Sequence, residues 1–346
     1  MKLRKPGSRT IVILTAFACL VLAFGWPEWR MKVQAIYYKI GTINDLGTLG
    51  GTLGYAFDIN SKRQVAGYST LSNGFPRAFF WENGVMRDLG TLGGSFSIAL
   101  ALNDRGQVVG YSETSGALVH AFLWENNRMK DIGPVASAFS LAYDINHRGQ
   151  ITGYFTDARN RPHAYIWEKS RFIDLTSTDS EGFATGLNDG GQVVGYSAPI
   201  GLPFHATLWI NGAHQILGTL GGTSSFAYVI NKKGQIAGAS YIAGDTAFHA
   251  FFWEDGVLND LGTLGGMFSL ARSIDDRRRV IGWSQIADNQ NRAFMWEDGV
   301  MTDLNSLLPS NSHWTLLEGA GINKDGFIVG MGINPDGQLR PYLLQP

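Results

Sequence analysis

A unit of about 43 residues recurs along almost the whole chain, and this repeat constrains the fold more than any other feature of the sequence. Residues 88–129 form the clearest copy. An apolar residue followed by Asn or Asp marks the same point in seven copies: Ile59-Asn60, Leu102-Asn103, Ile145-Asn146, Leu187-Asn188, Ile230-Asn231, Ile274-Asp275 and Ile322-Asn323. Successive marks lie 43, 43, 42, 43, 44 and 48 residues apart. Such a period is typical of solenoids, propellers and other repeat arrays.

Tryptophan provides a second measure of the period, with spacings of 43, 43, 42, 44 and 43 residues between Trp81, Trp124, Trp167, Trp209, Trp253 and Trp296. In most copies an aromatic residue stands two positions earlier, so both side chains lie on the same face of a strand. This pattern favours packing between neighbouring sheets, since large aromatic side chains bury much apolar surface. A platform for stacking sugar rings would require those rings to be exposed.

Each unit is predicted to contain four short strands, because short apolar runs are separated by turn residues and no long apolar pattern with the 3.6-residue period of a helix is present. In the second unit these strands are 98–103, 107–112, 120–125 and 128–132. Asn103 can cap the first turn and Gly106 can adopt a positive φ there. Arg63 and Arg278 stand where this glycine is expected, so we predict that those two hairpins either differ locally or carry a strained residue. Four strands in one unit of this length are typical of a propeller blade.

The two ends of the repeat region complement each other. After the seventh mark there is room for strands at 327–331 and 341–344 but not for a fourth strand, whereas residues 37–46 predict a fourth strand with no first three before it. Pairing the two ends would close a ring of 28 strands and leave no open edge. The sequence therefore predicts an all-β, seven-bladed β-propeller over residues 37–346, closed by its N-terminal strand.

The first 25 residues lie outside the repeat and resemble a secretory signal. An apolar run at 11–22 is followed by a small-x-small cleavage site at 23–25 and preceded by four basic residues, Lys2, Arg4, Lys5 and Arg9. If the segment stays uncleaved, residues 11–26 are slightly shorter than the ~17 to 25 residues that span a bilayer. We expect a signal peptide or membrane anchor at 1–25, a linker at 26–36, and a secreted, periplasmic or cell-surface body that meets the membrane only through an uncleaved leader.

Cysteine content and charge exclude several classes of function. Cys19 is the only cysteine and lies in the leader, so the body has no disulfide and no thiol for catalysis or metal binding. Without the four N-terminal basic residues, 24 Lys and Arg face 29 Asp and Glu, which gives no basic surface for nucleic acid. No Gly-x-Ser-x-Gly elbow, phosphate loop or His-Glu-x-x-His motif is present. We therefore predict no cofactor and no metal.

Several motifs recur in register: Gly-Thr-Leu-Gly-Gly at 47–51, 90–94, 218–222 and 262–266, Gly-Gln-Val-Val-Gly-Tyr-Ser at 106–112 and 191–197, and His-Ala-Phe at 120–122 and 249–251. From about residue 44 to the C-terminus, the chain resembles the HAF-repeat family of bacterial repeat proteins, for which an extracellular location is expected. The resemblance implies export and repetition, and it brings no catalytic residues with it.

The histidine of this triplet exchanges with arginine across the copies, at Arg77, His120, His163, His205, His249, Arg292 and Arg340. These residues should open the third strand of each blade and form a wide ring, which cannot converge on one metal ion. Because His and Arg share donor capacity, hydrogen bonds to a neighbouring loop are favoured. The Asn-containing turns do not supply the six to eight oxygens that calcium requires.

Strand order predicts where a ligand would bind. In a four-stranded meander the first and third turns lie at one rim, while the second-to-third loops and the crossings between blades lie at the other. The second-to-third loops vary most between copies, and variable loops on a rigid scaffold usually carry binding. The longest crossing, 305–314, reaches the same rim. The first candidates for ligand contact on this variable-loop rim are His313, Trp314, Arg159, Arg161 and Tyr241.

Asp58 and Asp144 are candidates to line the central channel, although paired carboxylates act together only at separations near 5 or 9 Å. The first strands are otherwise mostly small and apolar. These features favour an exported, non-catalytic binding or scaffold module for an extracellular protein or carbohydrate. The alternative is an extracellular propeller hydrolase or lyase that acts on carbohydrate or lactone substrates, which would place convergent acids or histidines on the inner strands.

Overall fold

The computed structural model describes residues 41–134 and 137–346, so the predicted leader, the linker and residues 37–40 of the predicted N-terminal strand lie outside the described ranges. Within these ranges the chain forms 28 strands in four-stranded antiparallel sheets and one short 3-10 helix, η1 (Leu304–Leu307). The predicted all-β, propeller-like fold is confirmed. No helix of the described residues is long and apolar enough to cross a membrane.

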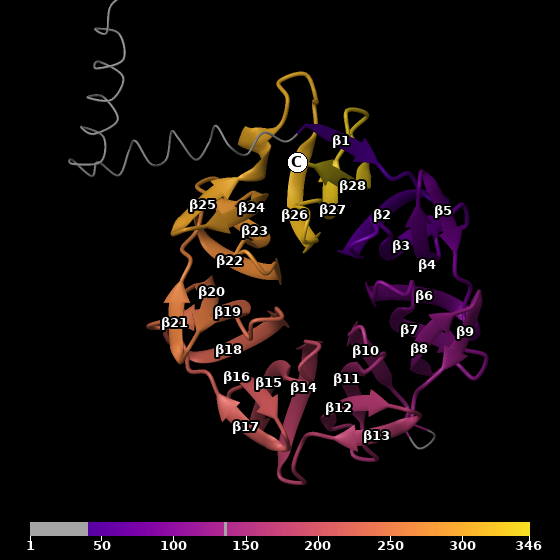
Figure 1. Ribbon diagram of the computed structural model, residues 1–346, viewed down its shortest axis with the longest axis vertical. Helices are drawn as coiled ribbons and strands as arrows, with labels where there is room; N and C mark the ends of the chain where they lie inside the picture. The colour runs from indigo at the N-terminus through magenta and orange to yellow at the C-terminus, as the bar shows by residue number, and fades with distance from the viewer. Residues whose placement is uncertain (1–40, 135–136) are drawn as a thin grey trace, which may run out of the picture. The chain divides into compact units, whose positions relative to one another are not determined.

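The sheets stand around a common centre (Figure 1). Nearest the centre are β2 (Gly50–Ile59), β6 (Gly93–Leu102), β10 (Ser140–Ile145), β14 (Ser180–Leu187), β18 (Gly221–Ile230), β22 (Gly265–Ile274) and β26 (Thr315–Ile322). The second strands are β3 (Val65–Leu71), β7 (Val108–Thr114), β11 (Ile151–Thr156), β15 (Val193–Pro199), β19 (Ile236–Ile242), β23 (Val280–Ile286) and β27 (Ile328–Ile333). The third are β4 (Pro76–Glu82), β8 (Val119–Glu125), β12 (Pro162–Glu168), β16 (His205–Ile210), β20 (Phe248–Glu254), β24 (Asn291–Glu297) and β28 (Leu339–Gln345). The outermost are β5 (Val85–Asp88), β9 (Arg128–Asp131), β13 (Arg171–Asp174), β17 (Ala213–Ile216), β21 (Val257–Asp260), β25 (Val300–Asp303) and β1 (Thr42–Asp45).

The N-terminal strand belongs to the sheet of the C-terminal strands, whose order is β1-β28-β27-β26. Ile43 lies opposite Leu344, and the Gly41 N–H donates to the Gln345 carbonyl at 2.9 Å. Two sheets, β18–β21 and β22–β25, are also joined by one parallel bridge between Phe248 and Phe268. The two ends of the repeat region therefore share one sheet.

The inner strands are longer than predicted. β6 begins at Gly93 instead of residue 98, because Gly93 pairs with Thr114 at the end of β7. The second glycine of the Gly-Gln-Val-Val-Gly-Tyr-Ser motif is required because the neighbouring strand lies very close to it. A Cβ on Gly110 would lie 2.0 Å from the Ile98 carbonyl oxygen. Gly110 faces the fully buried Ala99, so small residues let the strands pack tightly near the centre.

Turn conformations follow the residues that occupy them. Asn126 and Asn127 have φ values of 51° and 59°, the signature of the tight turn that matches the twist of a hairpin. In the first turns Gly106 has a φ of 75°, while Arg63 and Arg278 adopt 64° and 70°. The predicted strain at these two arginines is confirmed, because a left-handed backbone costs a non-glycine residue free energy.

Aromatic side chains fill the spaces between sheets. Phe79 and Phe122 are fully buried and Trp124 is only 7% exposed. Phe80 stacks on Trp124 of the next sheet with ring centroids 5.8 Å apart, and Phe252 and Trp296 repeat this contact at the same distance. The packing interpretation of the aromatic pattern is confirmed.

Some of the His and Arg residues that open the third strands hydrogen-bond the segment that leads into the next sheet, as predicted. His120 Nδ1 lies 2.8 Å from Asp131 Oδ2, and its Nε2 lies 3.2 Å from the Ser137 carbonyl oxygen. In the first copy, Arg77 donates from Nη1 to the Ser95 carbonyl at 2.7 Å. Arg340 repeats this contact with the Thr52 carbonyl at 2.8 Å, whereas Nδ1 of His205 is buried without a hydrogen-bond partner in the described part of the chain.

Candidate functional site

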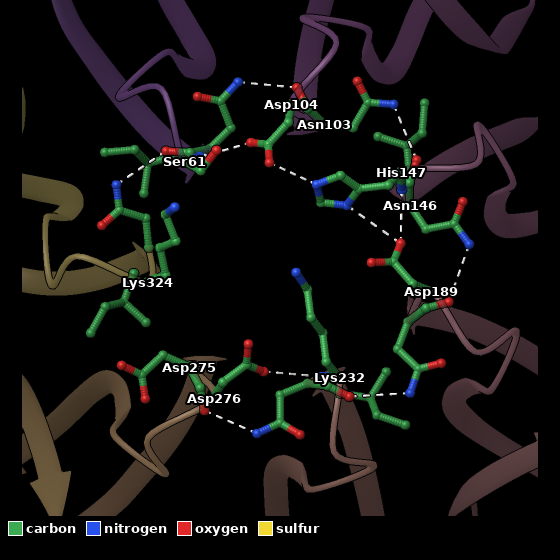
Figure 2. A pocket seen from close by; sticks show the side chains of 18 of the residues that line it. Ser61, Asn103, Asp104, Asn146, His147, Asp189, Lys232, Asp275, Asp276 and Lys324 are labelled. Carbon is green, nitrogen blue, oxygen red and sulfur yellow. Dashed lines mark hydrogen bonds and ion pairs between the residues drawn. The ribbon is translucent and has the colours of Figure 1, made fainter.

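A pocket of 310 Å³ lies where the inner strands end and the first turns begin (Figure 2). It is lined by seven sets of three consecutive residues, each of which begins with the apolar member of the repeat mark at the end of an inner strand and continues into the turn that follows. The third residue of each set forms a polar ring, which we call the mouth ring: Ser61, Asp104, His147, Asp189, Lys232, Asp276 and Lys324. The pocket lies at the rim opposite the predicted variable-loop rim.

The asparagines of the repeat mark hold the inner strands in place around this pocket. Asn103 Oδ1 accepts from the N–H groups of Arg105 and Gln107, which caps the turn. Its Nδ2 donates to the carbonyl of Asn146 on the next inner strand at 3.1 Å. The bond recurs around the centre, and Asn323 donates to the Asn60 carbonyl at 3.1 Å, 263 residues away in sequence. The asparagine side chain thus stabilises its own turn and links it to the equivalent turn of the next sheet.

One half of the mouth ring is linked directly by hydrogen bonds. Asp104 accepts from the Ser61 N–H at 2.8 Å and lies 2.7 Å from His147 Nε2. His147 Nδ1 lies 3.4 Å from Asp189, whose Oδ1 also accepts from the His147 N–H. Although burial opposes it, hydrogen bonding from His147 and Ser61 lowers the pKa of Asp104 below its usual value. Asp104 is therefore held as a carboxylate near neutral pH.

The other half of the mouth ring carries two ammonium groups. Figure 2 shows Lys232 extending into the middle of the opening, with Asp276 and Lys324 in the equivalent turns of the next two sheets. Asp276 Oδ1 accepts from the Lys232 N–H at 3.2 Å. In the described part of the chain, neither lysine ammonium group has a hydrogen-bond or ion-pair partner. No group of three or more His, Cys, Asp or Glu among the described residues could hold a metal ion.

Asp58 and Asp144 link neighbouring inner strands. Asp58 accepts from its own neighbour Ile59 at 2.7 Å and from the Leu102 N–H on β6 at 3.0 Å. Asp144 makes the equivalent bonds to Ile145 and to Leu187 on β14, at 2.7 and 2.9 Å. Burial raises the pKa of Asp58 to about 6 and that of Asp144 to about 7, and hydrogen bonding to the backbone limits both shifts. Neither residue lines the pocket.

A second polar cluster on the inner strands was not identified from the sequence. Arg272 donates from Nε to Glu318 Oε1 on β26 at 2.5 Å, and its Cζ lies 6.0 Å from the Tyr228 ring on β18. Burial raises the pKa of Tyr143 on β10, and the charge of Arg272 opposes this rise. Alignment of the repeats could have indicated this cluster, because Arg272 is charged at a position where the other copies have an aromatic, aliphatic or small residue.

The five predicted ligand contacts lie in three different sheets, and none of them lines the pocket. Arg161 is held by Asp157, which accepts from its Nε at 2.8 Å, and it donates from Nη1 to the Thr178 carbonyl. Arg159 is exposed, as is His313, which has a φ of 53°. Tyr241 and Trp314 are half-buried against Phe248 and Tyr342, respectively.

Exposed apolar side chains gather at the variable-loop rim. Most of the large hydrophobic residues that remain exposed stand at this end of the strands: Phe75, Leu118, Ile200, Leu202, Met267 and Leu339. Their exposed fractions range from 38% to 58%. Five of them lie in or directly beside second-to-third loops, where the copies differ most in sequence.

No protein-family model and no curated protein matches the sequence. Solved structures match the fold. The β-propeller domain of the Trilobed protease from Pyrococcus furiosus has a TM-score of 0.56 at 10% identity, with 85% of this chain and 96% of that domain covered. A puromycin-hydrolyzing peptidase from Mycobacterium tuberculosis has a TM-score of 0.52 at 11% identity, with 88% of this chain and 53% of the peptidase covered. At these identities the likeness shows a β-propeller fold alone.

Proposed function

We propose that the chain is an exported, seven-bladed β-propeller of the HAF-repeat type that binds an extracellular protein through its variable-loop rim. The observation that carries the proposal is the set of six exposed apolar side chains at this rim. Exposed apolar groups on a rigid scaffold favour a protein partner, because burying them against another apolar surface stabilises the complex. A carbohydrate partner is an alternative outcome of the same experiment.

The closed ring is the scaffold of this proposal. It is supported by the pairing of β1 with β28, by the bond from Asn323 to Asn60, and by a pocket lined equally from all seven inner strands. A closed ring leaves no strand edge open to other chains and holds the loops of one rim in fixed positions.

Site-specific photocrosslinking in the exported full-length chain tests the binding face. A photoreactive residue is introduced singly at Tyr241, Trp314 or Leu202 on the variable-loop rim, and at Lys233 on the opposite rim as the matched control. Defined adducts with an extracellular protein are expected only from the variable-loop positions. Adducts that form only from Lys233 would show that the opposite rim carries the partner.

A set of substitutions then measures the contribution of each group. Exchanging Phe75, Leu118 and Leu202 for Ser should weaken the crosslinked complex about tenfold or more, because each buried apolar side chain contributes about 1.5 to 3 kcal/mol. The five polar and aromatic candidates, His313, Trp314, Arg159, Arg161 and Tyr241, are replaced together by Ala in a second variant. An adduct with glycan instead of protein would redirect the proposal to a carbohydrate ligand.

The alternative function is a hydrolase or lyase for extracellular carbohydrate or lactone. One observation favours it, which is that Asp58 and Asp144 have pKa values near neutrality. Turnover of an oligosaccharide or lactone that is lost in the Asp58→Ala/Asp144→Ala variant would support this alternative. Both carboxylates already accept two backbone N–H bonds, which favours a structural role for them.

A further inference from the structure

The mouth ring is divided by charge into two halves. Lys232, Asp276 and Lys324 stand in the turns that follow the consecutive inner strands β18, β22 and β26, and they carry a net charge of about +1 at neutral pH. The other half, in the turns that follow β2, β6, β10 and β14, contains Ser61, Asp104, His147 and Asp189, and its two aspartates contribute about −2. A ligand at the centre of the ring would therefore experience an electric field directed from one half to the other.

The aspartates that face the opening are held in place before any ligand binds. Each of them accepts a backbone N–H from the turn after the preceding inner strand, at 2.8 Å for Asp104, 3.0 Å for Asp189 and 3.2 Å for Asp276. The asparagine amides beneath them join the strands. Preorganised polar groups bind a ligand at lower entropic cost than flexible ones.

Some of these groups retain unused bonding capacity. Within the residues described, the ammonium groups of Lys232 and Lys324 contact no carboxylate within ion-pair distance, and Oδ2 of Asp189 and of Asp276 accepts no hydrogen bond. Two donors and two acceptors of full charge are thus available at one opening. Ammonium and carboxylate groups form the strongest hydrogen bonds when their partner carries the opposite charge.

Chemical composition and size narrow the class of ligand. The lining residues include no Phe, Tyr or Trp side chain on which a sugar ring could stack. A simple anion would meet four carboxylates, of which that of Asp275 is paired with Arg279, and a simple cation would meet Lys232 in the middle of the opening. A volume of 310 Å³ lies at the small end of the range of about 300 to 1,000 Å³ found for ligand pockets.

We propose that the mouth ring binds a small zwitterion of the amino acid or dipeptide class. The carboxylate end of the ligand lies toward Lys232 and Lys324, and its ammonium end lies toward Asp189 and Asp104. This site is separate from the variable-loop rim, because it lies at the other end of the inner strands, and it does not depend on the function proposed for that rim.

Isothermal titration of the purified exported protein tests the proposal with a matched series of ligands. The twenty free amino acids and glycylglycine are the zwitterions, N-acetylglycine lacks the ammonium group, and glycinamide lacks the carboxylate. At least one zwitterion is expected to bind with a dissociation constant below about 10 mM, and removal of either charge from the ligand should weaken binding about tenfold or more. Binding should also weaken as salt concentration rises.

Substitutions in the chain provide the matched controls. Lys232→Gln and Asp189→Asn are expected to weaken binding of the zwitterion about tenfold. Lys233→Gln changes an exposed neighbour that does not line the pocket and should leave binding unchanged. Substitutions at Trp314 and Tyr241 should also leave it unchanged, which separates this site from the proposed protein-binding rim.

Three results would overturn the proposal: no zwitterion binds up to about 10 mM, N-acetylglycine or glucose binds as well as the best zwitterion, or binding persists unchanged in Lys232→Gln. Circular dichroism and the thermal midpoint of each variant establish that it is folded. If Lys232→Gln does not fold, Lys324→Gln carries the same test, with Asp325→Asn as its exposed control.

Discussion

The asparagine of the repeat mark has two structural roles, because it caps its own turn and donates a hydrogen bond to the next inner segment. One copy has Asp275 at this position and compensates with Arg279. Asp275 caps its turn but has no N–H to donate to the next inner strand. Its Oδ2 instead accepts from Arg279 Nε at 2.7 Å, and both residues are almost completely buried. Arg279 stands where other copies have a Gln that accepts from the Asn amide, as Gln235 does from Asn231.

A double-mutant cycle at this pair is therefore informative. Asp275→Asn and Arg279→Gln should each cost about 3 kcal/mol of stability, because each breaks a buried ion pair by removing one of its two charges. The double variant should recover about 2 kcal/mol or more, since it recreates the Asn and Gln pair and supplies an N–H for the Asn323 carbonyl. Denaturant unfolding measures the four stabilities. Additive single effects would contradict the coupling.

The titration of Asp58 and Asp144 predicts how stability depends on pH. Their folded pKa values, about 6 and about 7, lie above the value near 4 of an unfolded aspartate. Their contribution to stability is fully present below pH 4 and is lost as the pH rises through 6 to 7. Asp104, Glu113 and Asp157 have lowered pKa values and act in the opposite direction as the solution becomes acidic. Stability should therefore be greatest near pH 4 and fall as the pH rises toward 7.

The control for this prediction occurs in the chain itself, because the second copy has Ala101 where the first and third have aspartate. In the Asp58→Ala/Asp144→Ala variant, the loss of stability between pH 4 and 8 should shrink by several kcal/mol, about the size of the two shifts combined. Urea unfolding at a series of pH values measures the slope. An unchanged slope would show that other groups determine it.

At the scale of elements, the four residues of β1 connect the two ends of the described chain. They pair with β28 through backbone hydrogen bonds, and Leu46, directly after the strand, is 5% exposed and packs in the core with Leu343. Leu46 also donates its N–H to the Pro341 carbonyl at 3.0 Å. Without this strand, β28 would present an unpaired edge to water.

Deleting residues 26–46 tests this element, with deletion of 26–36 alone as the matched control. The longer deletion should destabilise the body by about 4 kcal/mol or more, through lost burial of Leu46 and several lost hydrogen bonds. It should also promote aggregation through the exposed edge of β28. Calorimetry and light scattering measure both effects. An unchanged thermal midpoint would count against a closing role for β1.

At the scale of the whole molecule, the two rims of the body differ in construction. One rim carries tight turns joined by asparagine amides around a charged pocket, and the other carries longer loops with exposed apolar side chains. The body has no cysteine, so packing, hydrogen bonds and ion pairs hold its sheets together without a disulfide.

Export is a prediction from the leader sequence and can be measured directly. Fused to a reporter that is active only outside the cytoplasm, residues 1–30 should produce reporter activity in a bacterial host, because a basic segment followed by an apolar run directs secretion. Replacing the apolar residues Ile11, Val12, Ile13 and Leu14 with Gln should abolish it. Mass spectrometry of the mature N-terminus then distinguishes cleavage near Gly25 from an anchored chain. A silent reporter would refute the extracellular interpretation.

The sequence by itself determined the repeat, the strand types and the turns. The Asn and Gly residues of the first turns predicted hairpins, and the structure has Gly106 at a positive φ and Arg63 in the same strained conformation. These features are local, because they depend on residues within a few positions of each other, and a period of 43 residues repeats the same local solution.

The tertiary structure alone decided which residues meet. Lys232 and Asp104 lie far apart in sequence and line one pocket, because circular packing brings equivalent positions of distant copies to the same centre. Strand order indicated that the first turns share a rim, but not that the residue after each asparagine faces a common opening. Side-chain direction near the centre depends on sheet twist and on the bulge before each mark, such as that between Ala99 and Ala101. The pattern of apolar and polar residues within a copy reveals neither of these two features.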